Sequence, residues 1–71
     1  MGAKIDVLSI HELEILKAAL TGDIQRQEKY LAHDSNFETQ EKREEFEEWL
    51  VDTRKLWKKV TFKLMDLKSK Q

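Results

Sequence analysis

The chain of 71 residues contains no cysteine, no proline and only two glycines. Without cysteine it can form neither a disulfide nor a thiolate metal site, and nothing points to an oxidising compartment. The lack of proline and the scarcity of glycine favour long helices over sheets joined by tight turns. We therefore expect a single all-α domain.

Long apolar runs are lacking too. No run reaches the roughly 18 residues that a membrane span needs. The first ten residues have neither the apolar core nor the small-residue cleavage site of a secretory signal. Asp6 stands where the N-myristoylation pattern requires Ser or Thr. We therefore expect no membrane span and a cytoplasmic protein.

Charge of one sign does not dominate, although charged residues are abundant. They make up 38% of the chain, apolar residues make up 39%, and the net charge is −1. Disordered chains combine few apolar residues with a high net charge, so this chain should fold. Small domains bury a small share of their surface and usually depend on disulfides, a metal or oligomerisation. With disulfides excluded, we expect oligomerisation or a partner protein.

Apolar residues recur at helical spacing through the second half of the chain, where no glycine or proline interrupts residues 41–67. They fill three positions of a heptad, so the stripe is wider than the two-position seam of a coiled coil. One partner helix would leave part of this stripe exposed. The stripe consists of Phe46, Trp49, Leu50, Thr53, Leu56, Trp57, Val60, Leu64 and Leu67.

The first helix has a well-marked start. Ser9 and Glu12 match a capping box, and Leu8 and Leu13 stand at the two positions of a hydrophobic staple. Gly22 costs about 1 kcal/mol relative to alanine inside a helix, but the apolar period continues beyond it, so we expect one continuous helix. Its apolar face is formed by Leu13, Leu16, Leu20 and Ile24.

The only cluster of turn-forming residues divides two helices. The pattern predicts a leader over 1–8, a helix over 10–32, a loop over 33–37 and a longer helix over 38–68. Ser35 with Glu38 forms a second possible capping box, and Asp34 and Asn36 are rival caps.

A short loop forces the two helices to run back alongside each other as an antiparallel hairpin. Counting outward from the loop places Ile24 near Phe46 and Leu13 near Trp57. Val7 and Ile5 would then cover the far end of the second helix. A hairpin still leaves each stripe half open, and a two-fold homodimer that forms a four-helix bundle would close it. The predicted protein interface is Leu13, Leu16, Leu20, Ile24, Phe46, Trp49, Leu50, Leu56, Trp57, Val60 and Leu64.

Charge is segregated along the second helix. Residues 38–48 hold six Glu against Lys42 and Arg43, and residues 54–71 hold seven basic residues against Asp66. This polarity complements the helix dipole and keeps the exposed face soluble. It would also match the acidic end of one helix to the basic end of an antiparallel helix from a second chain. Both explanations remain open.

No constellation of residues indicates catalysis. His11 and His33 should lie at opposite ends of the first helix, and the Glu-x-x-His spacing of di-iron bundles is absent. The row of carboxylates at 41, 44, 45 and 48 is typical of a solvated helix face. The chain has no Gly-rich phosphate loop and no nucleophile elbow. We therefore predict no catalytic residue, no metal site and no cofactor.

A second surface lies toward the end of the chain, where exposed apolar residues stand beside basic ones. Such a surface can engage a partner protein, an anionic membrane surface or nucleic acid, unless the leader or a second subunit covers it. A membrane surface is disfavoured by the nearly neutral net charge. Nucleic acid is disfavoured because only one of the seven basic residues is Arg and the acidic half would repel phosphate. The residues are Arg54, Lys55, Lys58, Lys59, Phe62 and Met65.

These observations predict a non-enzymatic protein-interaction module that associates with itself and with a protein partner. In general appearance the chain resembles the small helical-hairpin proteins of bacterial and phage genomes. That resemblance implies an inhibitor, adaptor or regulator that covers a partner surface. One alternative is a small nucleic-acid-binding regulator that uses the basic face of residues 54–68 in a dimer. Another is a structural component that assembles with itself.

Overall fold

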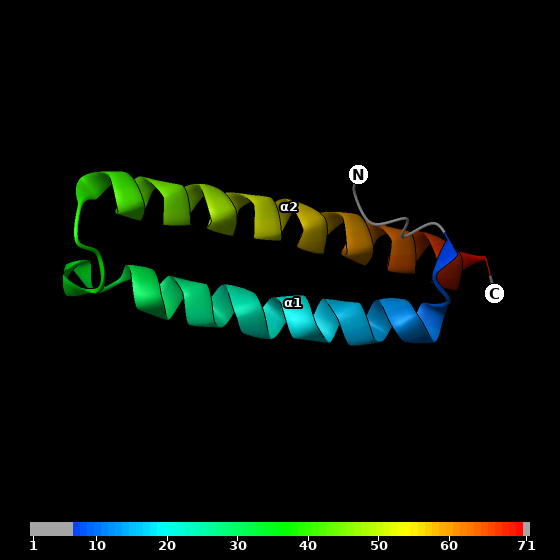
Figure 1. The fold of residues 1–71 in the computed structure, drawn as a ribbon. Helices are drawn as coiled ribbons and strands as arrows, with labels where there is room; N and C mark the ends of the chain where they lie inside the picture. The colour runs from blue at the N-terminus through cyan, green and yellow to red at the C-terminus, as the bar shows by residue number, and fades with distance from the viewer. Residues whose placement is uncertain (1–6, 71) are drawn as a thin grey trace.

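The protein is an all-α antiparallel hairpin of two helices that pack together, as the sequence predicts. The computed structural model describes residues 7–70. Helix α1 spans Ile10–Leu31, a short 3-10 helix η2 spans Asp34–Asn36, and helix α2 spans Gln40–Ser69. The end of α2 lies beside the start of α1 (Figure 1). Neither described helix has a stretch long and apolar enough to cross a membrane.

The predicted start of α1 is confirmed. The Glu12 backbone N–H donates to Ser9 Oγ at 3.1 Å, and the Ser9 N–H donates to Glu12 Oε1 at 2.8 Å, which completes the capping box. Leu8 packs against the core cluster that includes Leu13, as a hydrophobic staple requires. Helix α1 continues through Gly22 without a break, which confirms the predicted continuity.

The cap of α2 differs from the prediction. Thr39 is the N-cap, and its Oγ1 accepts from the Lys42 N–H at 3.2 Å. The rival caps are used elsewhere: Asn36 Nδ2 donates to the Tyr30 carbonyl at 2.8 Å, and Asp34 pairs with Arg43. Polar side chains in the loop therefore stabilise the end of α1 and the loop itself.

The core is small and lies toward the end of the hairpin opposite the loop. Leu13, Leu20, Val60 and Leu64 form one buried cluster, and Leu50 is buried nearer the loop. Val7 is 78% exposed, so the prediction that it covers the end of α2 is wrong. Ile5, which shared that prediction, lies outside the described residues. Half-buried residues packed against the cluster are Leu8, Ile10, Leu16, Leu56, Trp57 and Leu67.

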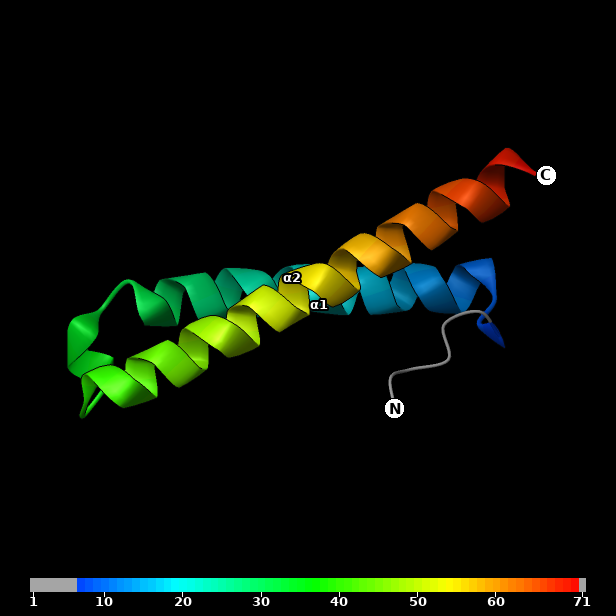
Figure 2. The ribbon, with the colours of Figure 1, turned by 90° about the horizontal axis from the view of Figure 1, so that it is seen from above.

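The register of the two helices also differs from the prediction. Trp57 reaches Thr21, about two turns beyond Leu13, and the ring of Phe46 lies 5.1 Å from that of Tyr30 rather than against Ile24. Counting outward from the loop assumed that the two helices leave the loop level with each other and stay aligned. Instead, α2 crosses α1 at an angle (Figure 2).

Candidate interaction surface

The hairpin has two long edges, and polar contacts between the helices close one of them. Arg54 on α2 forms an ion pair with Glu28 on α1. About one turn from the start of α1, Glu14 Oε2 lies 2.8 Å from Lys68 Nζ. All four side chains are about half exposed, so each pair contributes little stability, but together they occupy this edge. We call it the closed edge.

Trp57 fills the middle of the closed edge. Its indole Nε1 donates to Thr21 Oγ1 at 2.8 Å, so the polar atom of this half-buried ring is satisfied. Lys17 Nζ lies 5.5 Å from the ring centroid, within the range of a cation–π contact. Ile24 lines a cleft on the same edge. Trp57 therefore serves within the hairpin.

Lys68 lowers the pKa of the Glu14 carboxyl below its ordinary value of 4.5, first by hydrogen bonding and then by its charge, with smaller contributions from His11 and Lys17. Because the folded pKa is depressed, the stabilisation is present above the unfolded pKa and is lost as pH falls through the folded value. We predict that Lys68→Met raises the pKa of Glu14 toward the ordinary value, as measured by an NMR titration of its carboxyl carbon. An unchanged pKa in that variant would show that the Glu14–Lys68 contact does not form in solution.

The opposite edge presents aromatic and aliphatic side chains to solvent. Trp49 is 55% exposed and Tyr30 is 46% exposed, and with Phe46 they line a cleft between the helices. Leu56 follows Trp49 by one heptad, so it continues the same side of α2. Leu16 lies on the matching side of α1, two heptads before Tyr30. We call Leu16, Tyr30, Phe46, Trp49 and Leu56 the open edge.

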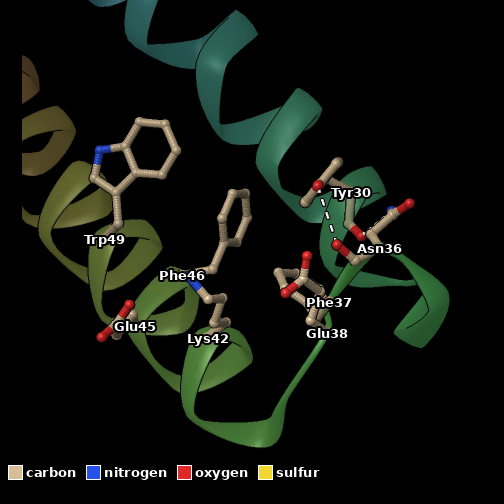
Figure 3. A pocket seen from close by; sticks show the side chains of 8 residues that line it. All are labelled: Tyr30, Asn36, Phe37, Glu38, Lys42, Glu45, Phe46 and Trp49. Carbon is tan, nitrogen blue, oxygen red and sulfur yellow. Dashed lines mark hydrogen bonds between the residues drawn. The ribbon is translucent and has the colours of Figure 1, made fainter.

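Four aromatic rings cluster at the loop end of the open edge. The ring centroid of Phe46 lies 5.3 Å from that of Trp49 and 5.5 Å from that of Phe37. The ring centroids of Phe37 and Tyr30 lie 5.3 Å apart, and all three pairs meet edge to face. Figure 3 shows the ring of Phe46 pointing across the gap toward Tyr30 at the end of α1. Such pairs are worth about 0.5–1.5 kcal/mol beyond their burial. The surrounding cleft is lined by Tyr30, Asn36, Phe37, Glu38, Lys42, Glu45, Phe46 and Trp49.

Arg43 holds the loop beneath this cluster, a role that the sequence did not reveal. Its NH1 donates to the Leu31 carbonyl at 3.0 Å and pairs with Asp34, and its guanidinium lies 5.7 Å from the ring centroid of Phe37. One of the last carbonyls of α1 is thereby satisfied. The only signal of this role in the sequence is a single Arg within a run of Glu, and that spacing alone is typical of a charge on the surface.

Gln27 is an unexpected member of the interface between the helices. It is only 5% exposed and lines the open-edge cleft beside Phe46 and Trp49. Its Oε1 is buried without a hydrogen-bond partner, which is costly for an amide oxygen. Thr53, equally buried, avoids this cost because its Oγ1 donates to the Trp49 carbonyl at 2.9 Å.

The residues predicted to form the protein interface divide into three groups within one chain. Leu13, Leu20, Leu50, Val60 and Leu64 are buried inside the hairpin. Trp49 is exposed. The half-buried residues are Leu16, Ile24, Phe46, Leu56 and Trp57.

The residues of the second predicted surface differ in their surroundings within one chain. Arg54 is engaged with Glu28, and Lys58 lines the closed edge. Lys55 lies in a depression with Glu44 and other carboxylates. The remaining members are exposed: Lys59, Phe62 at 63% and Met65 at 62%.

The groups considered for chemistry lie apart on the surface. His11 and His33 are exposed at opposite ends of α1, and the carboxylates at 41, 44, 45 and 48 are exposed on α2. Within residues 7–70, no group of three or more His, Cys, Asp or Glu side chains could hold a metal ion.

The chain matches no protein-family model, no curated protein and no solved structure. The open edge must therefore be interpreted from its own geometry.

Proposed function

We propose that the protein is a non-enzymatic interaction module that contacts its partners through the open edge. The observation that carries the proposal is Trp49, a large ring more than half exposed, next to the half-buried Phe46. Three aromatic rings line the cleft on this edge, together with Asp23, Arg26 and Gln27. Exposed aromatic residues grouped on one surface are typical of interfaces, and Trp is enriched among the residues that dominate binding energy.

The small core supports the same proposal. Only five apolar side chains in the described part of the chain are buried, and no disulfide strengthens the fold. A hairpin of this size gains stability when its remaining apolar surface is covered. Covering by another chain would complete a helical bundle, in keeping with self-association into four helices and with a regulator, inhibitor or adaptor that covers a partner protein. Nucleic-acid binding is less favoured, because Arg54 is already paired with Glu28.

The test compares two exposed aromatic residues of α2. Trp49→Glu places a charge on the open edge, whereas Phe62→Glu makes the same change at a position that is equally exposed in the single chain. We expect the wild type and Phe62→Glu to exceed the mass of one chain, and Trp49→Glu to associate at least about 30-fold more weakly, the loss expected for a hot-spot Trp. Light scattering on a sizing column over a hundredfold concentration range measures this, with circular dichroism to confirm that both variants stay helical.

Two outcomes would contradict the proposal. The first is a wild type that is a single chain with a cooperative unfolding transition independent of concentration, because a stable monomer needs no cover. The second is equal weakening by both substitutions, because the open edge would then have no special part in association.

A further inference from the structure

Resting on the proposed function, we propose that the cleft of the open edge receives an arginine side chain from a partner protein. The cleft has a volume of about 270 Å³. Pockets for drug-sized ligands begin at about 300 Å³, so this cleft suits one protruding side chain better than a separate small molecule. Its lining residues are Asp23, Arg26, Gln27, Tyr30, Phe46 and Trp49.

An unpaired acceptor in the lining of the cleft requires a hydrogen-bond donor from outside the hairpin. Gln27 is 5% exposed, and its Oε1 is buried without a hydrogen-bond partner. The polar groups beside it are engaged elsewhere: the Tyr30 hydroxyl donates to the Asn36 carbonyl at 3.2 Å, and Arg26 pairs with Asp23. An unpaired amide oxygen destabilises the fold. Its position next to the aromatic rings is explained if a bound side chain supplies the N–H.

A guanidinium matches the rest of the lining. Tyr30, Phe46 and Trp49 offer aromatic faces, and the ring centroid of Phe46 lies 5.1 Å from that of Tyr30 and 5.3 Å from that of Trp49. Arginine stacks on such faces and presents five N–H donors in one plane. One arginine side chain can therefore contact the rings and donate both to the Asp23 carboxylate and to Gln27 Oε1.

Arg26 already places a guanidinium on the Asp23 carboxylate, so this carboxylate is accessible to one. The side chain of Arg26 is 73% exposed and that of Asp23 is 47% exposed. Exposed pairs of this kind contribute little stability. The arginine of a partner can therefore displace Arg26 or share the carboxylate with it, and Arg26 acts as a competitor for the same site.

The charge around the cleft favours a basic partner. Residues 23–48 contain nine acidic residues against four basic ones. Glu38 and Glu45, together with Lys42, lie around the same aromatic rings (Figure 3). The excess of negative charge attracts a basic protein segment and repels nucleic acid.

The arginine comes from a different protein, because each arginine of this chain serves its own hairpin. The chain has three arginines, and all three form ion pairs within it. Arg26 lines the cleft itself, Arg43 holds the loop, and Arg54 joins the helices on the closed edge. A second copy would have to break one of these contacts, whereas a partner protein with an exposed arginine would not.

An NMR titration with three peptides tests the inference. The probe is the acetylated and amidated peptide Ala-Leu-Arg-Leu-Ala, and its matched controls carry citrulline, the neutral counterpart of arginine, or lysine at the centre. The indole N–H signal of Trp49 reports on the open edge, and that of Trp57 reports on the closed edge. The chain is kept dilute, because a second copy bound at the open edge would compete with the peptide.

We expect the arginine peptide to shift the signal of Trp49 and to leave that of Trp57 in place. It should bind at least about fivefold more tightly than the citrulline peptide, because citrulline lacks the charge. It should also bind more tightly than the lysine peptide, because an ammonium lacks the planar set of donors.

Variants of the cleft separate recognition from folding. Gln27→Leu should weaken binding of the arginine peptide at least about threefold, although we expect it to stabilise the fold. Gln25→Leu is the matched control, on the same helix but exposed, and should leave binding unchanged. Asp23→Asn should weaken binding and Arg26→Gln should strengthen it. Circular dichroism confirms that each variant is helical.

Four outcomes would overturn the inference. Equal affinity for the arginine and citrulline peptides would exclude a charged ligand, and equal affinity for the lysine peptide would exclude arginine as the recognised group. Unchanged binding in Gln27→Leu would remove the role of the unpaired oxygen. A Trp49 signal that moves with chain concentration but with none of the peptides would show a second copy in the cleft.

The proposed function is judged by a separate result. If no peptide binds but Trp49→Glu still weakens association, only the arginine is overturned and the open edge remains the interaction surface. Equal weakening of association by Trp49→Glu and Phe62→Glu would contradict the proposed function itself.

Discussion

Leu13→Ala should lower the free energy of unfolding by about 2–5 kcal/mol, the range for truncating a fully buried leucine. Leu13 is 0% exposed and belongs to the cluster of Leu20, Val60 and Leu64, which joins α1 to α2. Small domains have unfolding free energies of about 5–15 kcal/mol or less, so the loss would remove much of the stability of the hairpin. We expect the variant to be largely unfolded at ordinary temperature.

Urea unfolding followed by circular dichroism measures this effect, with all proteins at one chain concentration because association adds to apparent stability. Ile15→Ala is the matched control, since Ile15 lies two residues away and is 58% exposed. Its substitution should change the unfolding free energy by no more than about 0.5 kcal/mol, as is usual for surface sites. Similar losses at both positions would show that the helices do not pack through Leu13.

Gln27→Leu should act in the opposite direction and raise the unfolding free energy by about 1–3 kcal/mol, the usual cost of a buried unpaired polar group. Gln27 Oε1 lies buried without a hydrogen-bond partner, near the aromatic rings of Phe46 and Trp49. Leucine has a similar volume and a similar helix propensity, so the substitution removes the polar atom with little other change.

The matched control is Gln25→Leu, because Gln25 is on the same helix but exposed. Gln25→Leu should leave the urea midpoint of unfolding nearly unchanged. Gln27→Leu should shift that midpoint to a higher urea concentration without altering the slope of the unfolding free energy against urea concentration. A lower midpoint for Gln27→Leu would mean that the amide is hydrogen-bonded in solution, and that the contact between the helices at this level differs from the one described.

Local features of the sequence were enough to predict the fold class. The capping box of Ser9 and Glu12 involves atoms three residues apart, so its geometry follows from the chain itself. The period of apolar residues predicted both helices and the continuity of α1 through Gly22, and the short loop predicted the antiparallel hairpin. The same period predicted burial for Leu13, Leu20, Leu50, Val60 and Leu64.

The cap of α2 could not be chosen from local pattern. Ser35 with Glu38 has the better capping-box spacing, yet Thr39 is the cap. The outcome depends on contacts outside the local sequence, since Asn36 binds the end of α1 and Asp34 pairs with Arg43 nine residues later. Competition for the same side chains is visible only once the loop is folded.

The register and the difference between the two edges likewise arise from contacts that are distant in sequence. Trp49 and Trp57 both belong to the apolar stripe, at neighbouring heptad positions on its two flanks, but Trp57 meets Thr21 on the closed edge and Trp49 remains exposed on the open edge. That difference follows from the angle at which α2 crosses α1 and from the pairing of Arg54 with Glu28. Periodicity places a residue on a helix face, whereas the packing of two helices determines which side of that face is covered, because only then do side chains far apart in sequence meet.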